Sequence, residues 1–288
     1  MFGTISGSAK RKIIQLAALI GSNPFPGNFV SGTVHRGPTK AVCVPGLNCY
    51  SCPAAAASCP VGSMQSVLSG RTTSISLYVT GFLVLFGTVF GRFICGFLCP
   101  FGLYQEALHA LPGRKLTLPQ RLKGLGYLRY PVFIGLVILA PLFLVDSFGY
   151  GTSAFCAWVC PAGTLQAGIP IVSVQESLRA ITGALFNWKV SLLIFLSALS
   201  VVLYRPFCRF LCPLGLIYGW FNRISLHRIT VDSHRCTSCG VCTDACRLDI
   251  PIHLDPGTSE CIRCGDCVRA CPHGAVSMGF SLPGKRSG

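Results

Sequence analysis

Four apolar segments separated by polar stretches set the pattern of this chain. They cover about residues 12–30, 75–93, 130–148 and 186–204. The last three approach the roughly 20 apolar residues that a helix needs to cross a bilayer, whereas Asn23-Pro24-Phe25-Pro26-Gly27 interrupts the first. Because lipid offers backbone groups no hydrogen-bonding partner, we predict that these segments are helical. Buried core helices of a soluble protein are the alternative, which three such runs in one chain disfavour.

The pattern changes after about Ser225, where polar residues, aspartates and arginines alternate with cysteines. This change predicts a membrane domain in residues 1–224 and a small α+β domain outside the bilayer in residues 225–281. Residues 282–288 are predicted to form a disordered tail. The expected fold class is therefore an α-helical polytopic membrane protein with about four transmembrane helices and a C-terminal α+β domain.

The positive charges predict the orientation. The chain has 24 lysines and arginines against 9 acidic residues, a net charge of +15. Nineteen basic residues lie in the N-terminal tail, between the second and third segments, and from Arg205 onward. By the positive-inside rule both termini lie in the cytoplasm, with four crossings. The bases do not form the stripe that nucleic acid requires, so no nucleic-acid partner is expected. Only five bases are assigned to the outside: Arg36, Lys40, Arg71, Arg179 and Lys189.

The N-terminal segment is predicted to stay attached. Lys10-Arg11-Lys12 precedes an apolar run from Ile13 to Ile20, but no small-residue cleavage pattern follows it at a suitable distance. This arrangement favours an uncleaved first membrane segment over a signal peptide.

Composition adds a metal signature to the membrane pattern. Only 11% of the residues are charged and the mean hydropathy is +0.58, whereas about a quarter of residues are charged in a typical globular protein. The chain has 18 cysteines. Their short spacings are typical of metal sites rather than of a disulfide scaffold.

The string Cys-Pro-x-Gly occurs four times, and three copies have a second cysteine four residues upstream. A Cys-Pro pair is expected to place cysteine at a helix N-cap and proline at the first helical position. The free amides and the dipole of that helix end favour an anionic metal centre. Each motif offers two thiolates, so two motifs make one four-thiolate site. The repeat cysteines are Cys59, Cys99, Cys160 and Cys212. The upstream cysteines are Cys95, Cys156 and Cys208. The residues six positions after each repeat cysteine are Gln65, Gln105, Gln166 and Tyr218.

The four copies follow the four apolar segments in order, so they alternate between the outer and inner faces. Such an arrangement is an inverted repeat, as known in transporters. It predicts that one complete set of ligands converges at the cytoplasmic face: Cys95, Cys99, Cys208 and Cys212.

The outer set is one cysteine short, because Ala55 stands where the first copy would have its upstream cysteine. We predict that Cys52, which is also followed by proline, completes an outer cluster bound by Cys52, Cys59, Cys156 and Cys160. Cys43 and Cys49 are then left to pair as a disulfide, which an oxidising outer face permits. The alternative is that all six outer cysteines form disulfides.

Charged neighbours distinguish the two faces. Arg92, Arg205 and Arg209 flank the inner motifs. Because positive neighbours stabilise a reduced cluster, we expect the inner cluster to have the higher reduction potential. Asp146, at the end of the third segment, is predicted to be an interfacial residue rather than a proton carrier.

The C-terminal domain carries the most specific motif. Two runs of four cysteines have the spacing of bacterial two-cluster ferredoxins, in which the fourth cysteine of each run binds the other cluster. Gly240 and Gly265 are expected to let the backbone turn tightly around a cluster. Zinc is the alternative, but zinc sites usually separate their cysteine pairs by longer spacers. The predicted ligands are Cys236, Cys239, Cys242 and Cys271 for cluster 1, and Cys261, Cys264, Cys267 and Cys246 for cluster 2.

These motifs resemble the membrane polyferredoxins of the NapH/NosR type. The resemblance covers about residues 75–272 and rests on Cys95-Gly-Phe-Leu-Cys99-Pro100, Cys208-Arg-Phe-Leu-Cys212-Pro213 and the two ferredoxin runs. It implies an electron carrier of the inner membrane that is linked to anaerobic respiration and is often quinol-dependent. The Cys156–Cys160 motif and the Cys43–Cys59 group are additions to that pattern, and they favour a relay across the membrane.

The predicted function is that of an iron-sulfur electron-transfer subunit in a bacterial or archaeal cytoplasmic membrane, with [4Fe-4S] clusters as cofactors and no catalytic residues of its own. Expected partners are other redox subunits, a ferredoxin or flavoprotein on the cytoplasmic side, and an extracytoplasmic redox protein or a quinone. An assembly factor that reduces metal or thiols for another protein is the alternative. A redox sensor would need an output domain, and none is apparent.

Overall fold

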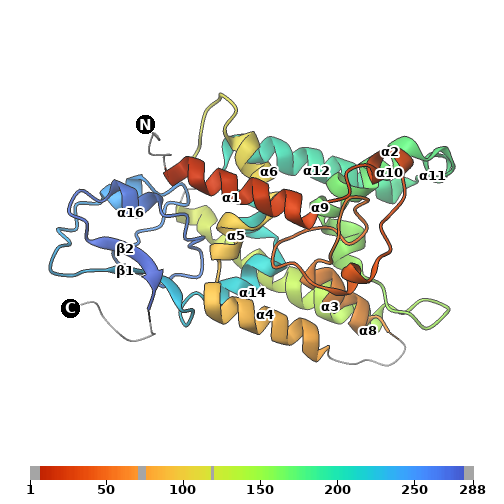
Figure 1. Ribbon diagram of the computed structural model, residues 1–288, viewed down its shortest axis with the longest axis horizontal. Helices are drawn as coiled ribbons and strands as arrows, with labels where there is room; N and C mark the ends of the chain where they lie inside the picture. The colour runs from red at the N-terminus through yellow and green to blue at the C-terminus, as the bar shows by residue number, and fades with distance from the viewer. Residues whose placement is uncertain (1–6, 71–75, 118–119, 282–288) are drawn as a thin grey trace.

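The computed structural model describes residues 7–70, 76–117 and 120–281. The predicted tail 282–288 and the expected start of the second apolar segment at residue 75 lie outside the described residues. Figure 1 shows a helical body elongated along one axis, with the C-terminal domain at one end. One hydrophobic core runs through both parts, since Ile94 of the body and Ile252 and Val276 of the C-terminal domain belong to the same buried cluster.

The body contains four long helical segments. Among the described residues, two of them are long and apolar enough to cross a membrane, namely 124–143 and 184–202. The other two segments are shorter than a membrane-spanning helix, whereas the sequence predicts four spanning helices. The segments are α1 (Gly7–Ser22), α4 (Leu77–Phe90), the series η2 (Gln120–Leu128), α7 (Arg129–Pro131), η3 (Val132–Leu139) and α8 (Ala140–Phe143), and α12 (Ala184–Val202).

Local chemistry accounts for the two short segments. The α1 helix ends just before Asn23-Pro24, because proline disfavours a helical conformation in the residue before it. Its buried face is polar, with Arg11 and Gln15 turned into the body. The α4 helix begins where the side chain of Ser76 accepts the N–H of Val79 at 3.3 Å, and it ends at Gly91 with φ of 54°.

The third segment ends earlier than residue 148. The α8 helix ends at Phe143, and a turn follows in which the carboxylate of Asp146 accepts the N–H groups of Phe148 and Tyr150, both at 2.9 Å. Asp146 therefore organises an exposed turn beyond the helix, where aspartate is a common turn residue.

Each Cys-Pro pair begins a helix, as the sequence predicts. In all four copies the repeat cysteine is the N-cap and proline occupies the first helical turn. The helices are α3 (Pro60–Leu68), α6 (Pro100–His109), α14 (Pro213–Phe221), and α9 (Pro161–Gly163), which continues as η5 (Thr164–Gly168) and α10 (Ile169–Val174). The upstream cysteines lie in α5 (Phe93–Phe97), η4 (Phe155–Val159) and α13 (Pro206–Phe210). The remaining short helices of the body are α2 (Asn28–Ser31), η1 (Pro38–Ala41) and α11 (Glu176–Ala180).

The C-terminal domain is a small α+β unit. Strand β1 (His227–Val231) pairs antiparallel with β2 (Val276–Phe280), and the two cysteine runs lie between them with α15 (Val241–Asp244) and α16 (Asp266–Ala270). Gly240 and Gly265 cap these two helices with φ of 81° and 79°. The expected tight turns at these glycines are thus confirmed, because glycine adopts positive φ without the steric cost of a Cβ atom.

The C-terminal domain packs closely against the body. The guanidinium of Arg263 is buried and donates to the backbone oxygens of Phe90 at 3.1 Å and Asn222 at 2.6 Å. A Cβ atom placed on Gly96 would lie only 2.5 Å from the backbone oxygen of Ile262. The lack of a side chain at Gly96 therefore lets the loop of the second cysteine run touch α5.

This contact predicts the effect of Gly96→Ala. The added methyl group has no room beside a backbone oxygen, so we expect a destabilisation of about 1–3 kcal/mol. Denaturant unfolding of the detergent-solubilised protein measures it. Gly279→Ala is the matched control, because a Cβ at Gly279 meets no atom within 4 Å. Equal stability of the two variants would contradict the close contact.

Candidate metal centres

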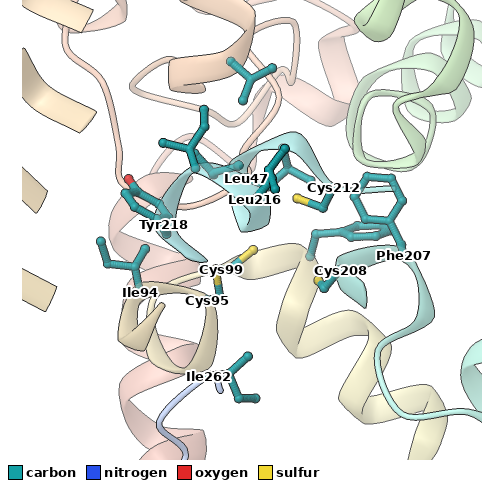
Figure 2. Packing of buried hydrophobic residues seen from close by; sticks show 14 of the residues in the cluster. Leu47, Ile94, Cys95, Cys99, Phe207, Cys208, Cys212, Leu216, Tyr218 and Ile262 are labelled. Atoms are coloured by element: carbon teal, nitrogen blue, oxygen red, sulfur yellow. The ribbon is translucent and has the colours of Figure 1, made fainter. Parts of the chain in front are cut away.

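The four inner cysteines come together in the middle of the body. Two belong to the pair α5–α6 and two to the pair α13–α14, and all four are buried. Figure 2 shows their sulfur atoms facing one space, with Leu47 on one side and Ile262 on the other. This group, the inner site, consists of Cys95, Cys99, Cys208 and Cys212.

Polar groups hold the cysteines of the inner site. Gln105 accepts the N–H of Phe207 at 3.1 Å and donates to the sulfur of Cys208 at 3.1 Å. The N–H of Gly215 points at the sulfur of Cys212 at 3.4 Å. Amides directed at sulfur are the donors that a thiolate or an anionic cluster needs.

Two buried arginines bracket the inner site. Arg92 donates to the backbone oxygen of Cys208 at 3.3 Å, and Arg205 donates to that of Cys95. The third predicted arginine differs, because Arg209 extends toward the C-terminal domain and donates to Leu248 at 3.1 Å. Two of the three expected cations thus lie beside the inner cysteines.

A buried carboxylate balances one of these cations. Glu106 bonds Arg205 at 2.8 Å and Arg11 at 3.1 Å, and it also accepts from Tyr204 and Gln15. Burial by itself would raise the pKa of Glu106, but Arg205 and Arg11 hold that pKa below its usual value. Glu106 is therefore an ionised partner of both guanidinium groups.

A second group of cysteines lines a cavity of about 810 Å³ at the far end of the body. Lys189 lies in the wall of this cavity and donates to the backbone oxygen of Cys156 at 3.2 Å. The cysteines that line the cavity are Cys43, Cys49, Cys59, Cys156 and Cys160. We call this region the outer site.

The structure does not bring Cys52 to the outer site. Cys52 is buried in a separate small cluster with Ala54 and Ala55, and its sulfur faces the side-chain oxygen of Asn23 at 3.7 Å. The loop turns between Cys49 and Cys52, where the N–H of Cys52 bonds the oxygen of Cys49 at 3.1 Å. As a result, Cys49 rather than Cys52 faces the cavity.

All eighteen cysteines lie in the described residues, and no disulfide joins any two of them. The predicted Cys43–Cys49 disulfide is not present. The sulfur of Cys43 instead lies 3.7 Å from the hydroxyl of Ser63.

The loop 43–58 connects the two sites. Leu47 lines the outer cavity, and its backbone amide also faces the thiol of Cys99. Burial and Cys208 raise the pKa of Cys99 to about 12, and that amide opposes the shift. Tyr218 donates its hydroxyl to the backbone oxygen of Pro45 in the same loop at 3.1 Å. The outer loop therefore extends into the body and reaches the inner site.

The C-terminal cysteines lie in two groups, and the sequence predicts one cluster for each. Cys236, Cys239, Cys242 and Cys271 line one small cavity. In the other group, burial and then Cys261 and Cys246 raise the pKa of Cys267 to about 12. Burial, Asp266 and Cys261 likewise raise the pKa of Cys264 to about 12.

One arginine joins the second ferredoxin run to the inner site. Arg92 donates to the backbone oxygen of Ser259 at 2.7 Å and pairs with Glu260 at 3.4 Å, just before Cys261. Arg92 also donates to the backbone oxygen of Cys208. A single buried side chain therefore contacts both the second ferredoxin run and the inner site. The cysteine group that the sequence predicts for cluster 2 is therefore the C-terminal group next to the body.

The inner site and the first C-terminal group each offer four cysteines, the number of thiolates that a [4Fe-4S] cluster binds. Within the described residues, no three His, Cys, Asp or Glu side chains are arranged to hold one metal ion. A zinc ion needs all its thiolates about 2.3 Å from one point. In a [4Fe-4S] cluster each thiolate binds a different iron, so the ligands are spread more widely.

The amides at the starts of the helices also point at the repeat cysteines. Burial raises the pKa of Cys59 to about 12, and hydrogen bonds from the amides of Gly62 and Val61 oppose that shift.

The glutamines six residues after the repeat cysteines make contacts that the sequence did not reveal. Each side-chain oxygen accepts a backbone N–H from a cysteine segment of another motif. The equal spacing of these glutamines from their repeat cysteines was the signal that could have found them. The spacing does not identify the partner of each glutamine, because that partner lies far away in the sequence.

Comparison with protein families agrees with these groups. A 4Fe-4S binding domain model matches residues 72–119, 131–173 and 187–231, and a second 4Fe-4S binding domain model matches residues 257–277. The matched regions contain three of the four Cys-Pro repeats and the second ferredoxin run. The first repeat, with Cys59, precedes them.

Individual relatives have related descriptions. An uncharacterized protein of Methanocaldococcus jannaschii is 29% identical over 215 residues, which are 71% of this chain and 79% of that protein. The methylamine utilization ferredoxin-type protein MauN of Paracoccus denitrificans is 30% identical over 71% of this chain and 66% of its own length. The ferredoxin-type protein NapH of Haemophilus influenzae is 29% identical over 69% of this chain and 66% of its own length.

No solved structure matches the chain. The family follows from the matched 4Fe-4S domains, from relatives that include NapH, MauN and NosR, and from the grouped cysteines. The chain belongs to the membrane polyferredoxin family of NapH/NosR-type 4Fe-4S binding proteins.

Proposed function

We propose that this protein is a membrane-bound electron-transfer subunit that relays electrons between the C-terminal ferredoxin-like domain and the opposite face of the membrane. In this proposal both termini are cytoplasmic, and the four long segments cross the bilayer. The bound [4Fe-4S] clusters supply one-electron redox chemistry at each site. The donor, the acceptor and the direction of flow depend on partner subunits, a soluble carrier or a quinone.

The order of the cysteine groups along the molecule carries the proposal. Cluster 1 and cluster 2 share the C-terminal domain, Arg92 lies between cluster 2 and the inner site, and Leu47 contacts both the inner and the outer site. A bilayer core of roughly 30 Å would be too wide for a single electron-transfer step. The inward loop 43–58 supports a shorter path, because it brings the outer cavity next to Cys99.

The residues of this path have separate tasks. Arg92 and Arg205 supply positive charge beside the inner thiolates, and Glu106 limits that charge. At the outer site two lysines line the cavity: Lys189 donates to the backbone oxygen of Cys156 and Lys40 to that of Cys52.

Reconstituted vesicles provide the test. With a reduced dye outside and an oxidised dye trapped inside, the holoprotein should carry electrons across the bilayer, and iron analysis should give about sixteen irons per polypeptide for four clusters. Vesicles with protein stripped of iron are the control. A holoprotein that transfers no faster than this control would rule out the relay.

An assembly factor that reduces metal or thiols is the second candidate, and the outer cavity favours it. This cavity has five cysteines, one more than a cluster requires, so one thiol remains for chemistry on another protein. Such a factor would reduce an added disulfide or metal ion without carrying electrons between the two compartments.

A further inference from the structure

We propose that Cys49 is the fourth ligand of the outer site, with Cys59, Cys156 and Cys160, and that Gln166 is the residue that positions it. This inference rests on the outer cluster of the proposed function and specifies its ligands. It assigns no metal to Cys52 or to Cys43.

The glutamines identify Cys49 through a reciprocal pair of hydrogen bonds. The side-chain oxygen of Gln65, in the first repeat, accepts the N–H of Cys156, the upstream cysteine of the third repeat, at 3.3 Å. The side-chain oxygen of Gln166, in the third repeat, accepts the N–H of Cys49 at 2.7 Å. Cys49 therefore has the same relation to the third repeat as Cys156 has to the first.

The inner site supports the same relation. Gln105, in the second repeat, accepts the N–H of Phe207, which directly precedes the upstream cysteine Cys208 of the fourth repeat. In all three cases a glutamine holds the backbone of the segment that carries the partner cysteine. This geometry fixes where the partner sulfur lies, because the backbone position limits the reach of a short cysteine side chain.

The glycines of the motif give a second, independent correspondence. A Cβ atom placed on Gly62 would lie 3.8 Å from the sulfur of Cys156, and one placed on Gly163 would lie 3.7 Å from the sulfur of Cys49. These glycines occupy the same position in the first and third repeats. The sulfur atoms of Cys156 and Cys49 thus approach equivalent positions at the starts of two helices.

The other two cysteines lack these relations. Cys52 is buried against Ala54 and Ala55, and its sulfur faces Asn23. Cys43 lines the cavity, but its N–H bonds the hydroxyl of Tyr78 at 3.0 Å and its sulfur faces Ser63. Neither is held by a glutamine of a Cys-Pro repeat.

The ligand is tested with three single substitutions in the full-length protein, purified without oxygen: Cys49→Ser, Cys52→Ser and Cys43→Ser. Iron and acid-labile sulfide are measured, and EPR spectra are recorded during a reductive titration. We expect Cys49→Ser to lose about four irons and one cluster signal, or to show the spectrum of a cluster with altered ligation, whereas the other two variants keep the wild-type values.

The positioning role is tested with Gln166→Ala, which leaves every cysteine in place. We expect it to shift the potential or the EPR spectrum of the outer cluster alone, because the segment carrying one ligand is released. Gln105→Ala is the matched control and should shift only the inner cluster. If Gln166→Ala lowers thermal stability and leaves both spectra unchanged, Gln166 has a structural role and does not position the ligand.

The outcomes separate this inference from the proposed function. Loss of the outer cluster in Cys52→Ser or Cys43→Ser, with Cys49→Ser intact, would overturn the assignment and leave the relay standing. A wild-type protein with about twelve irons, unchanged in all three variants, would remove both the ligand and the outer cluster.

Discussion

Replacing Glu106 by alanine is expected to lower the free energy of unfolding by about 3–5 kcal/mol, because it leaves buried guanidinium groups without their counter-ion. Glu106 bonds Arg205 at 2.8 Å and Arg11 at 3.1 Å, and the arginine side chains are 1% and 3% exposed. Arg11 already has two nitrogen atoms without a hydrogen-bond partner. Loss of the carboxylate would add to these unpaired buried donors.

Denaturant unfolding of the solubilised protein measures this effect. Glu176→Ala is the matched control: Glu176 is exposed in α11, and removal of an exposed carboxylate usually changes stability by less than about 0.5 kcal/mol. Glu106→Gln keeps the shape of the side chain and removes the charge, so it should also raise the potential of the inner cluster. A Glu106→Ala variant as stable as Glu176→Ala would show that the buried ion network contributes little.

Replacing Cys208 by alanine is expected to remove the inner cluster and to stop electron transfer across vesicles. About four irons should be lost per polypeptide. The two clusters of the C-terminal domain should remain, because their cysteines form separate groups. Transfer should fall to the rate of iron-free vesicles, since the inner site lies between the C-terminal domain and the outer site.

The remaining clusters serve as the internal control for Cys208→Ala. Reduction of the C-terminal clusters by an added reductant, followed by EPR, shows whether the variant is folded and loaded. Unchanged transfer with the inner cluster absent would mean that electrons bypass the inner site, and the proposed order of centres would then be wrong.

Local features of the structure were predictable from the sequence. The N-cap position of Cys59, Cys99, Cys160 and Cys212 depends on the dihedral angles of proline and on amides a few residues away. The turns at Gly240 and Gly265 depend on a single positive φ each.

The convergence of the inner cysteines was predictable for a different reason. The two inner motifs are complete, and the positions of lysine and arginine assign both to one face. No choice among cysteines remained, so topology alone was enough to group Cys95, Cys99, Cys208 and Cys212.

The lengths of the apolar helices were predicted less well. Hydrophobic pattern suggested four spanning segments, but α4 has 14 residues and α1 turns Arg11 and Gln15 toward Glu106. The apolar pattern of α1 does not reveal that its polar face is buried, because the carboxylate that this face contacts lies far away in the sequence.

The outer site shows most clearly where sequence reasoning ended. The sequence by itself determined the repeats, their helix N-caps, the ferredoxin runs and the inner set, because each depends on neighbouring residues or on charge counted along the chain. Only the tertiary structure decided that Cys49 faces the outer cavity and Cys52 does not, since the hydrogen bond that holds Cys49 comes from Gln166, 117 residues away. It also decided that the loop 43–58 extends inward to Cys99. The physical reason is that packing between distant segments selects which of several equivalent thiols reaches a site, and spacing along the chain carries no information about that choice.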